Sequence, residues 1–536
     1  MPEFPRVLPF GDRALLVEFE DVLSPEVNGR VRALARRLAD VPGVIETVPA
    51  FRSVLAVLDP RAGSQDTAAR TALELARSIP AAPSGTARVL DVPVVYGGDS
   101  GPDLPAVAGA TGLSPDEIVF IHGSREYLVY MLGFAPGFPY LGTVDERLRV
   151  PRLDVPRIRV PAGSVAVADW LTGIYPSQTA GGWRLIGRTP LRTYDPADPD
   201  PFLFQPGDRV RFVPIPHAEF EGDLGTARPM RAAARPVLEV LEPGLYTTVQ
   251  DAGRPGYRSR GLPASGAMDL LALRNANAAV GNHPNAAVLE LTTPGPVLLA
   301  LDQVTVAVAG ADLPASVDGT PVSPEEPTPM ARGQTLELRG QTPQFGLPRR
   351  GVWAYLALEG GVDVPRPLGS AATYVPGRLG GLAGRRLIAG DVLGRRSDPR
   401  GRPAGSPPAV ALPGDEVVIR FVPGPQADWF TGDAMGVLTS SPYQVTVHAD
   451  RAGTRLAGPA LRHRGRADIL SDGMLPGAIQ VPGSGQPIVI MADGPTTGGY
   501  PKIGVVVSED LRLLAQARPG TQIRFVEVSL SSLRGA

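Results

Sequence analysis

An internal repeat is the feature that most limits the folds this chain can adopt. Residues 179–187 (TAGGWRLIG) align without gaps with residues 496–504 (TTGGYPKIG). Two more pairs of segments match in the same order and with similar spacing: residues 163–167 with 477–481, and residues 206–212 with 519–525. Collinear matches of this kind rarely arise by chance, so we infer two halves that end in domains of one fold. The alternative is that both regions are β-hairpins that share common turn residues.

The chain is long enough for several domains. Its 536 residues correspond to about three or four domains of ordinary size. Pro- and Gly-rich breaks indicate further loops at 321–333 and 395–414. The pattern predicts a small α+β domain at 1–84, a β-rich domain at 85–216, a linker at 217–236, a first domain of the second half at 237–408 and a C-terminal domain at 409–536.

The predicted first domain contains both helical and strand periodicity. Ser24 precedes apolar residues at helical spacing, and a second helix is predicted at 67–79. Alternating apolar residues predict strands at 14–20, 44–48 and 53–58.

The following region is instead made of short β-branched runs broken by Gly and Pro. These runs predict strands at 92–96, 158–160, 164–168, 183–186 and 210–214, with one helix that begins at Pro115. This pattern favours an antiparallel barrel or sandwich.

Composition excludes several classes of function. The net charge is −2, so nothing favours a nucleic acid or an anionic membrane as partner. The absence of cysteine excludes disulfides, thiolate metal sites and cysteine nucleophiles. The N-terminal residues have no signal-peptide pattern, and the apolar run at 304–311 is too short to span a bilayer. We therefore expect a cytoplasmic protein.

A single lysine, Lys502, stands among 52 basic residues. A lysine can lose its proton when it is desolvated, whereas an arginine effectively cannot. The functional interpretation is an amine that titrates or acts as a point charge. The alternative is that an arginine-rich composition left its last lysine at an arbitrary place.

Two motifs of the first half suggest ligand contacts. Residues 127–142 are dense in Gly, Pro and aromatic residues, a composition that lets a rigid loop approach a ligand closely. His122 precedes this loop, although a lone histidine is more often a structural hydrogen-bonding group. Arg188 follows the Gly181-Gly182 turn and is suited to bind a carboxylate or phosphate. Its alternative role is a solvated strand end.

In the second half, Asp269 closes the motif Ser265-Gly-Ala-Met-Asp before a predicted helix. It either favours the first turn of that helix through the helix dipole, or it is a buried acid that orients a substrate amide or pairs with Lys502. No phosphate loop, dinucleotide motif or nucleophile elbow is present, and the five histidines have no metal-ligand spacing. We expect no metal site.

The residues that carry these motifs resemble two related families. Residues 96–140 and 181–190 resemble allophanate hydrolase subunit 1, also called the B-type subunit of 5-oxoprolinase. Residues 247–256, 265–269, 481–488 and 496–502 resemble allophanate hydrolase subunit 2, also called the C-type subunit of 5-oxoprolinase. The two resemblances together cover nearly the whole chain.

The resemblance implies a fold that is mostly β with α+β parts. It implies two cyclophilin-like β-barrel halves, each with an additional smaller α+β or β-rich subdomain. Three roles occur among such relatives: the carboxyltransferase part of urea carboxylase, the B–C part of ATP-dependent 5-oxoprolinase, and a sporulation-kinase inhibitor pair.

The substrates of the two enzymes share an N–H beside a C=O. Activation requires stabilised charge on the oxygen and control of the N–H proton. By resemblance, Lys502 would supply the cation or proton, Asp269 would hold the N–H, and His122 would complete the catalytic group. The expected substrate-binding residues are Gly133, Tyr140, Gly181, Gly182, Arg188, Gln250, Thr497, Gly498, Gly499 and Tyr500.

The leading hypothesis is a fused B–C component of 5-oxoprolinase. It would act with a separate A-type subunit and with ATP, with Mg²⁺ expected, on a small cyclic amide. The alternatives are a biotin-dependent carboxyltransferase that uses carboxybiotin, and a regulator that binds a histidine kinase. A homo-oligomer is compatible with each. The sequence contains no biotin-carboxylase region and no amidase signature, and Thr179-Ala180 stands where relatives often have Ser-Pro.

Overall fold

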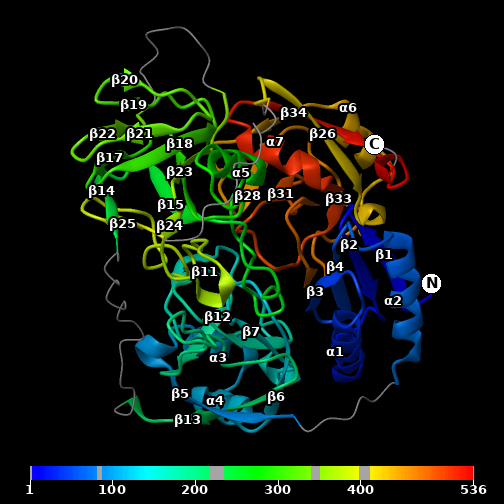
Figure 1. The fold of residues 1–536 in the computed structure, drawn as a ribbon. Coiled ribbons are helices and arrows are strands. Elements are labelled where there is room, and N and C mark those ends of the chain that lie inside the picture. Colours follow the sequence, from blue (N-terminus) through cyan, green and yellow to red (C-terminus); the bar gives the residue numbers. More distant parts are fainter. Residues whose placement is uncertain (1–2, 81–86, 218–234, 340–349, 397–410, 535–536) are drawn as a thin grey trace.

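The computed structural model describes residues 3–80, 87–217, 235–339, 350–396 and 411–534 (Figure 1). We call these the N-terminal domain (3–80), the first barrel (87–217), the middle domain (235–396) and the second barrel (411–534). The predicted boundaries near 84 and 408 fall outside the described residues, as does most of the predicted linker at 217–236.

The N-terminal domain is an antiparallel sheet covered by two helices. The strands follow the order β1-β2-β4-β3. Ser24 accepts hydrogen bonds from the first turn of α1, which confirms it as the residue that begins this helix. Helix α2 begins two residues earlier than predicted, because Ser64 caps it. The elements are β1 Arg6–Phe10, β2 Ala14–Glu18, α1 Pro25–Ala39, β3 Val44–Pro49, β4 Ser53–Leu58 and α2 Gln65–Ser78.

The first barrel is closed, in the order β10-β7-β6-β13-β5-β12-β9. A separate two-stranded sheet, which we call the first flap, pairs β8 Arg157–Val160 with β11 Thr179–Gly181. The helices are α3 Leu104–Thr111 and α4 Pro115–Gly123. The barrel strands are β5 Val89–Tyr96, β6 Glu126–Leu132, β7 Pro139–Gly142, β9 Ser164–Ala168, β10 Leu171–Ile174, β12 Arg184–Arg188 and β13 Arg209–Pro214.

The middle domain contains two sheets and the helix α5 Leu270–Ala279. The larger sheet comprises β14 Pro236–Glu242, β17 Val297–Ala300, β19 Ser316–Val317, β20 Thr320–Pro321, β22 Thr335–Glu337, β24 Val362–Asp363 and β25 Val392–Arg395. The smaller sheet comprises β15 Tyr246–Gln250, β16 Val288–Thr292, β18 Val304–Gly310, β21 Thr328–Met330 and β23 Ala354–Leu358.

One loop prediction in the middle domain was wrong. The segment predicted as a loop at 321–333 contains β21, which lies at the edge of the smaller sheet. An edge strand tolerates Pro329 because only one of its sides has to pair.

The second barrel repeats the plan of the first, in the order β26-β33-β30-β31-β28-β27-β34. Each barrel has one parallel strand pair, β5 with β13 and β26 with β34. The second flap pairs β29 Asp472–Gly473 with β32 Thr497–Gly498. The other elements are β26 Glu416–Pro423, α6 Ala434–Ser440, β27 Tyr443–Val445, β28 Gly453–Ala457, β30 Ala478–Gln480, β31 Ile488–Ile490, β33 Lys502–Val506, α7 Leu511–Gln516 and β34 Gln522–Glu527.

The two closed barrels confirm the predicted fold class and explain the sequence repeat. The repeated segments at 179–187 and 496–504 form equivalent parts, since each continues from a flap strand into a barrel strand.

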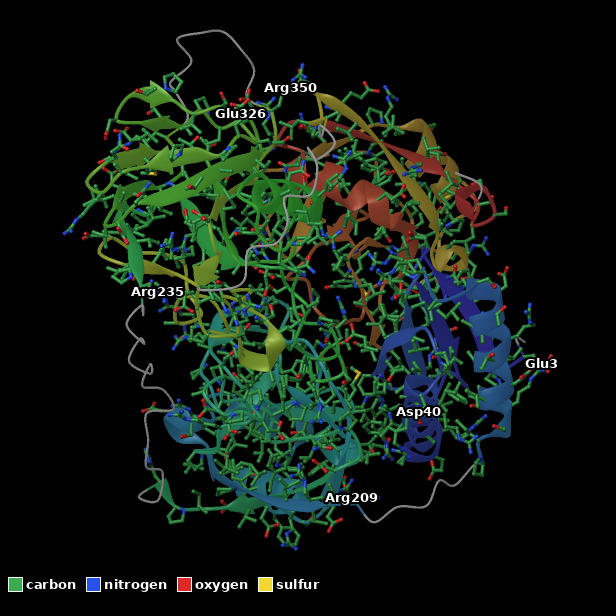
Figure 2. All side chains as sticks on the ribbon, viewed as in Figure 1. Glu3, Asp40, Arg209, Arg235, Glu326 and Arg350 are labelled. Atoms are coloured by element: carbon green, nitrogen blue, oxygen red, sulfur yellow. The ribbon has the colours of Figure 1, made fainter. Side chains whose placement is uncertain are left out.

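The N-terminal domain packs on the second barrel rather than only on its neighbour in sequence (Figure 1). Phe10 and Leu55 share a core with Met474 and Val505. Side chains fill the space in which the N-terminal domain and the two barrels approach one another (Figure 2). Among the described residues, no helix combines the length and apolar character needed to cross a bilayer.

Candidate functional site

Lys502, the first residue of β33, is fully buried in an ion pair. Its Nζ lies 2.5 Å from Asp472 Oδ1. Asp472 Oδ2 accepts a hydrogen bond of 3.0 Å from Gln426 Nε2, and Gln426 Oε1 accepts one of 3.3 Å from the Lys502 backbone N–H. Burial raises the pKa of the Asp472 carboxyl, against the opposing effect of the Lys502 charge. The three residues thus close a ring of polar contacts inside the protein, one of which is made by the Lys502 backbone.

The first barrel has a different set of residues at the equivalent positions. The repeat places Leu185 where the second barrel has Lys502. The flap registers place Arg157, paired with Gly181, where the second barrel has Asp472, paired with Gly498.

The role of Gln426 also has a counterpart in the first barrel. Asp103 accepts the backbone N–H of Leu185 and pairs with Arg157. The barrel fold therefore forms without a lysine at this place, although the first barrel has an ion pair of its own there, between Asp103 and Arg157.

Residues of three domains meet beside the second flap. We call this meeting point the barrel junction; it is formed by Phe51, Gly133, Tyr140, Leu470 and Thr497. Phe51 of the N-terminal domain packs there with Tyr140 of the first barrel and with Leu470 of the second. A Cβ atom added to Gly133 would lie 2.1 Å from Thr497 Oγ1, so only glycine lets the first-barrel loop approach the flap this closely.

The barrel junction contains buried hydroxyl groups. Thr497 approaches the Tyr140 hydroxyl, but its own hydroxyl makes no hydrogen bond of ordinary geometry. The Thr496 hydroxyl is also buried without a partner. Burial raises the pKa of Tyr140, which therefore stays protonated. Buried hydroxyl groups from the first barrel and from the second flap thus lie at this junction.

The barrel junction lies next to the Lys502–Asp472 pair. Gly498 is the flap partner of Asp472, and Thr497 is the residue before it. Glu18 and Arg52 of the N-terminal domain are close enough to act electrostatically on Asp472. The structure thus brings together Gly133, Tyr140, Thr497, Gly498 and Lys502 from the predicted set.

Several other predicted residues lie within the first barrel. Gly181 and Gly182 end the first flap, and a Cβ at Gly181 would lie 2.3 Å from the Tyr175 hydroxyl oxygen. Arg188 donates from Nε to the Ala162 carbonyl oxygen over 2.8 Å. These are the equivalents of flap and strand residues in the second barrel, and their substrate-binding role stays a prediction.

Asp269 has partners other than Lys502. It begins helix α5, where its Oδ1 accepts the backbone N–H groups of Leu271 and Ala272. Its Oδ2 accepts a hydrogen bond of 3.0 Å from Gln516 Nε2 of the second barrel. These contacts describe a helix cap that also joins two domains. The proposed pairing with Lys502 is not formed, since Asp472 holds that amine.

Ser265, in the same motif, also joins these two domains. Ser265 donates to Asp493, which pairs with Arg451 over 2.7 Å. Arg451 also pairs with Glu290 of the middle domain. A buried chain of charges therefore connects the middle domain to the second barrel.

His122 is enclosed in the first barrel with both ring nitrogens engaged. Its Nδ1 lies 2.7 Å from the Tyr96 hydroxyl oxygen, and its Nε2 lies 2.9 Å from Thr172 Oγ1. Burial lowers the pKa of His122 to about 3, so the ring is neutral. These contacts match a structural histidine, and its catalytic role stays a prediction.

The other predicted ligand residues occupy different surroundings. Gln250 is buried in the middle domain and donates to Thr248 and Thr373. Tyr500 is 40% exposed at the turn that follows the second flap, next to Gly499. Asp472 was missed by sequence reasoning. The signal for it was weak, because its Ser-Asp-Gly context is typical of an ordinary turn.

Two family models match the chain. The carboxyltransferase domain, subdomain C and D, matches residues 5–204, and the carboxyltransferase domain, subdomain A and B, matches residues 260–527. The chain belongs to the carboxyltransferase-domain family. In this chain the C/D part precedes the A/B part.

Relatives of this carboxyltransferase-domain protein include separate subunits. Residues of the second half are 39% identical over 302 residues to the C-type subunit of 5-oxoprolinase from Escherichia coli K12, covering 55% of this chain and 92% of that protein. Those of the first half are 44% identical over 205 residues to the B-type subunit of 5-oxoprolinase from Escherichia coli O157:H7, covering 38% of this chain and 93% of that protein. The chain therefore corresponds to a fusion of B-type and C-type parts.

Solved structures agree with this assignment. The crystal structure of TTHA0988 is 40% identical, with a TM-score of 0.83, and covers 96% of this chain and 99% of that chain. The urea amidolyase of K. lactis is 32% identical, with a TM-score of 0.51, over 56% of this chain and 19% of that chain.

Proposed function

We propose that this chain is the fused B–C component of an ATP-dependent 5-oxoprolinase, and that Lys502 and Asp472 act on the lactam. The names of relatives that match both halves support the activity. The observation that carries the assignment of residues is the Lys502–Asp472 pair itself. It is buried beside the barrel junction, and the first barrel has leucine in place of the lysine.

The pair has the chemistry that a lactam requires. A buried ammonium stabilises negative charge that develops on the carbonyl oxygen, and its effect is large where water is excluded. A carboxyl whose pKa is raised by burial can receive and return the lactam proton. Asp472 thus takes the role that the sequence suggested for Asp269.

The proposed partner is an A-type subunit. We propose no residue of this chain as a ligand of ATP or Mg²⁺. Among the described residues, no group of three or more His, Asp or Glu side chains is arranged to hold a metal ion. In the proposed complex, this chain binds the lactam and handles charge and proton at the reacting amide.

The activity is tested with the complete system. The purified chain and an A-type subunit are incubated with 5-oxoproline and ATP, and glutamate is measured. We expect glutamate only when both proteins and ATP are present. Absence of glutamate from the complete mixture would contradict the proposed activity.

The role of the ion pair is tested with the double variant Lys502→Leu, Asp472→Asn. This variant gives the second barrel the leucine that the first barrel has at Leu185. Because removal of both charges leaves none unpaired, we expect the free energy of unfolding to stay within about 1 kcal/mol of wild type. Glutamate formation should fall by roughly 100-fold or more.

The matched control is Leu185→Met at the equivalent buried position of the first barrel. A volume-conserving change there should cost about 1 kcal/mol or less and leave turnover unchanged. Full activity of the double variant would reject a catalytic pair. A large loss of its stability would instead show that the pair is structural.

A second candidate function is biotin-dependent carboxyl transfer. The similarity to the K. lactis urea amidolyase over 56% of this chain favours it. The ureido groups of biotin and urea also present an N–H beside a C=O, so the same ion pair fits them. Transfer of the carboxyl group from carboxybiotin to urea, measured without an A-type subunit, would distinguish this function.

A further inference from the structure

Arg254 carries a buried positive charge without a matching carboxylate. Its side chain is 1% exposed. Nη2 donates to the Ala372 carbonyl oxygen, whereas Nε and Nη1 have no hydrogen-bond partner. A buried guanidinium whose donors are left unsatisfied is unfavourable, and such groups normally find an acceptor.

The two carboxylates that act electrostatically on Arg254 already have other hydrogen-bond partners. Asp251 accepts hydrogen bonds from Gly253, Ser370 and Ala371. Asp493 pairs with Arg451 and accepts a hydrogen bond from Ser265. Both lie close enough to act electrostatically on Arg254, yet neither forms an ion pair with it. The protein itself therefore does not supply the anion.

A second unsatisfied group comes from the other half of the chain. The Tyr194 hydroxyl, in the first-barrel domain, is buried without a hydrogen-bond partner. Arg254 and this hydroxyl act electrostatically on each other, and both border the Gly-rich segment at 377–384. A ligand held here would be contacted by both halves.

A Gly-rich segment at 377–384 borders both groups. A Cβ at Gly380 would lie 2.8 Å from Arg254 Nη2, and one at Gly377 would lie 3.3 Å from the Tyr194 hydroxyl oxygen. Two non-glycine residues of this segment, Arg378 and Ala383, have φ values of 49° and 54°. Residues in such sparsely populated backbone conformations cluster at active sites and ligand-binding sites, where the surrounding structure holds them in place.

The geometry points to a binding site for the carboxylate of a small ligand, formed by Arg254 and the Tyr194 hydroxyl. A guanidinium is the group that best matches a carboxylate, through charge-assisted hydrogen bonds. The identity of the ligand rests on the proposed function: 5-oxoproline has a carboxylate, whereas urea has none. Binding of 5-oxoproline at this site would support the first of the two candidate functions.

Binding is measured by calorimetry on the whole chain, without ATP or an A-type subunit. The probes are 5-oxoproline, its primary amide, 2-pyrrolidinone, acetate and lactate. We expect 5-oxoproline to bind, and the two lactams without a carboxylate to bind roughly 10- to 100-fold more weakly. In Arg254→Met, 5-oxoproline should bind as weakly as those lactams.

Two further measurements separate binding from folding. Arg254→Met should unfold at or above the wild-type temperature when no ligand is present, because an unpaired buried charge is removed. Tyr194→Phe should leave that temperature unchanged and weaken 5-oxoproline binding by roughly 5- to 20-fold. A fall of more than about 5 °C in Arg254→Met would indicate a structural guanidinium and overturn the inference.

The outcomes distinguish this site from the proposed function. If acetate or lactate binds in an Arg254-dependent way but 5-oxoproline does not, the carboxylate site stands and the proposed substrate is wrong. If no carboxylate binds, or if Arg254→Met binds carboxylates as tightly as wild type, the inference is overturned. The ATP-dependent glutamate assay then still tests the proposed function independently.

Discussion

At the scale of single residues, the burial of His122 makes the stability of the protein depend on pH. Both ring nitrogens are engaged inside the first barrel, and burial lowers its pKa from 6.5 to about 3. The folded protein therefore keeps the ring neutral at pH values where the unfolded chain protonates it. The contribution of the neutral ring to stability is complete above pH 6.5 and is lost as the pH falls toward 3, by about 5 kcal/mol in total.

The measurement is urea unfolding of wild type and His122→Gln at pH 7.5 and pH 5. Between these values, wild type should lose about 2 kcal/mol more than the variant, which has no imidazole to protonate. Parallel losses in the two proteins would show that His122 is not the titrating group.

At the scale of elements, the loop between β6 and β7 touches the second flap. Because a Cβ at Gly133 would lie 2.1 Å from Thr497 Oγ1, Gly133→Ala should cost roughly 1–3 kcal/mol of unfolding free energy. Thr497→Ala in the same chain should recover most of that loss, since it removes the obstructing hydroxyl. Chemical denaturation of the single and double variants measures this coupling.

Gly182→Ala is the matched control for this test. The nearest atoms to a Cβ there lie 3.7 Å away, which is ordinary contact, so the change should be small. If the effects of Gly133→Ala and Thr497→Ala on unfolding free energy are additive, the loop between β6 and β7 does not make a close contact with the second flap.

At the scale of the whole molecule, the two halves share buried interfaces. The N-terminal domain and the second barrel have a common apolar core, and Asp12 accepts a hydrogen bond of 2.8 Å from Ser508. Glu46 forms an ion pair with the buried Arg258 of the middle domain. We therefore expect residues 1–217 and 235–536, produced as separate chains, to form a stable one-to-one complex.

Size-exclusion chromatography with light scattering checks the complex. Glu46→Ala should weaken it by roughly 3 kcal/mol, because Arg258 is then buried without its partner. Separate elution of the two wild-type chains would contradict a shared core.

The sequence by itself determined the local elements and the duplication. Apolar alternation located β2 and β4, Ser24 marked the start of α1, and the repeat at 179–187 and 496–504 indicated two domains of one fold. These signals are local, because strand alternation and helix capping depend on residues only a few positions apart. The repeat compares such local patterns, so it too is visible without a structure.

Only the tertiary structure decided which side chains meet. Lys502 was identified as distinctive, but its partner is Asp472 and not Asp269, which caps α5 and binds Gln516. Likewise, only the packed chain brings Tyr194 and Arg254 to the same Gly-rich segment. Periodicity indicates which face of a strand is buried, whereas the neighbours across that face depend on how separate sheets pack together. That packing is fixed by the whole core rather than by any one segment.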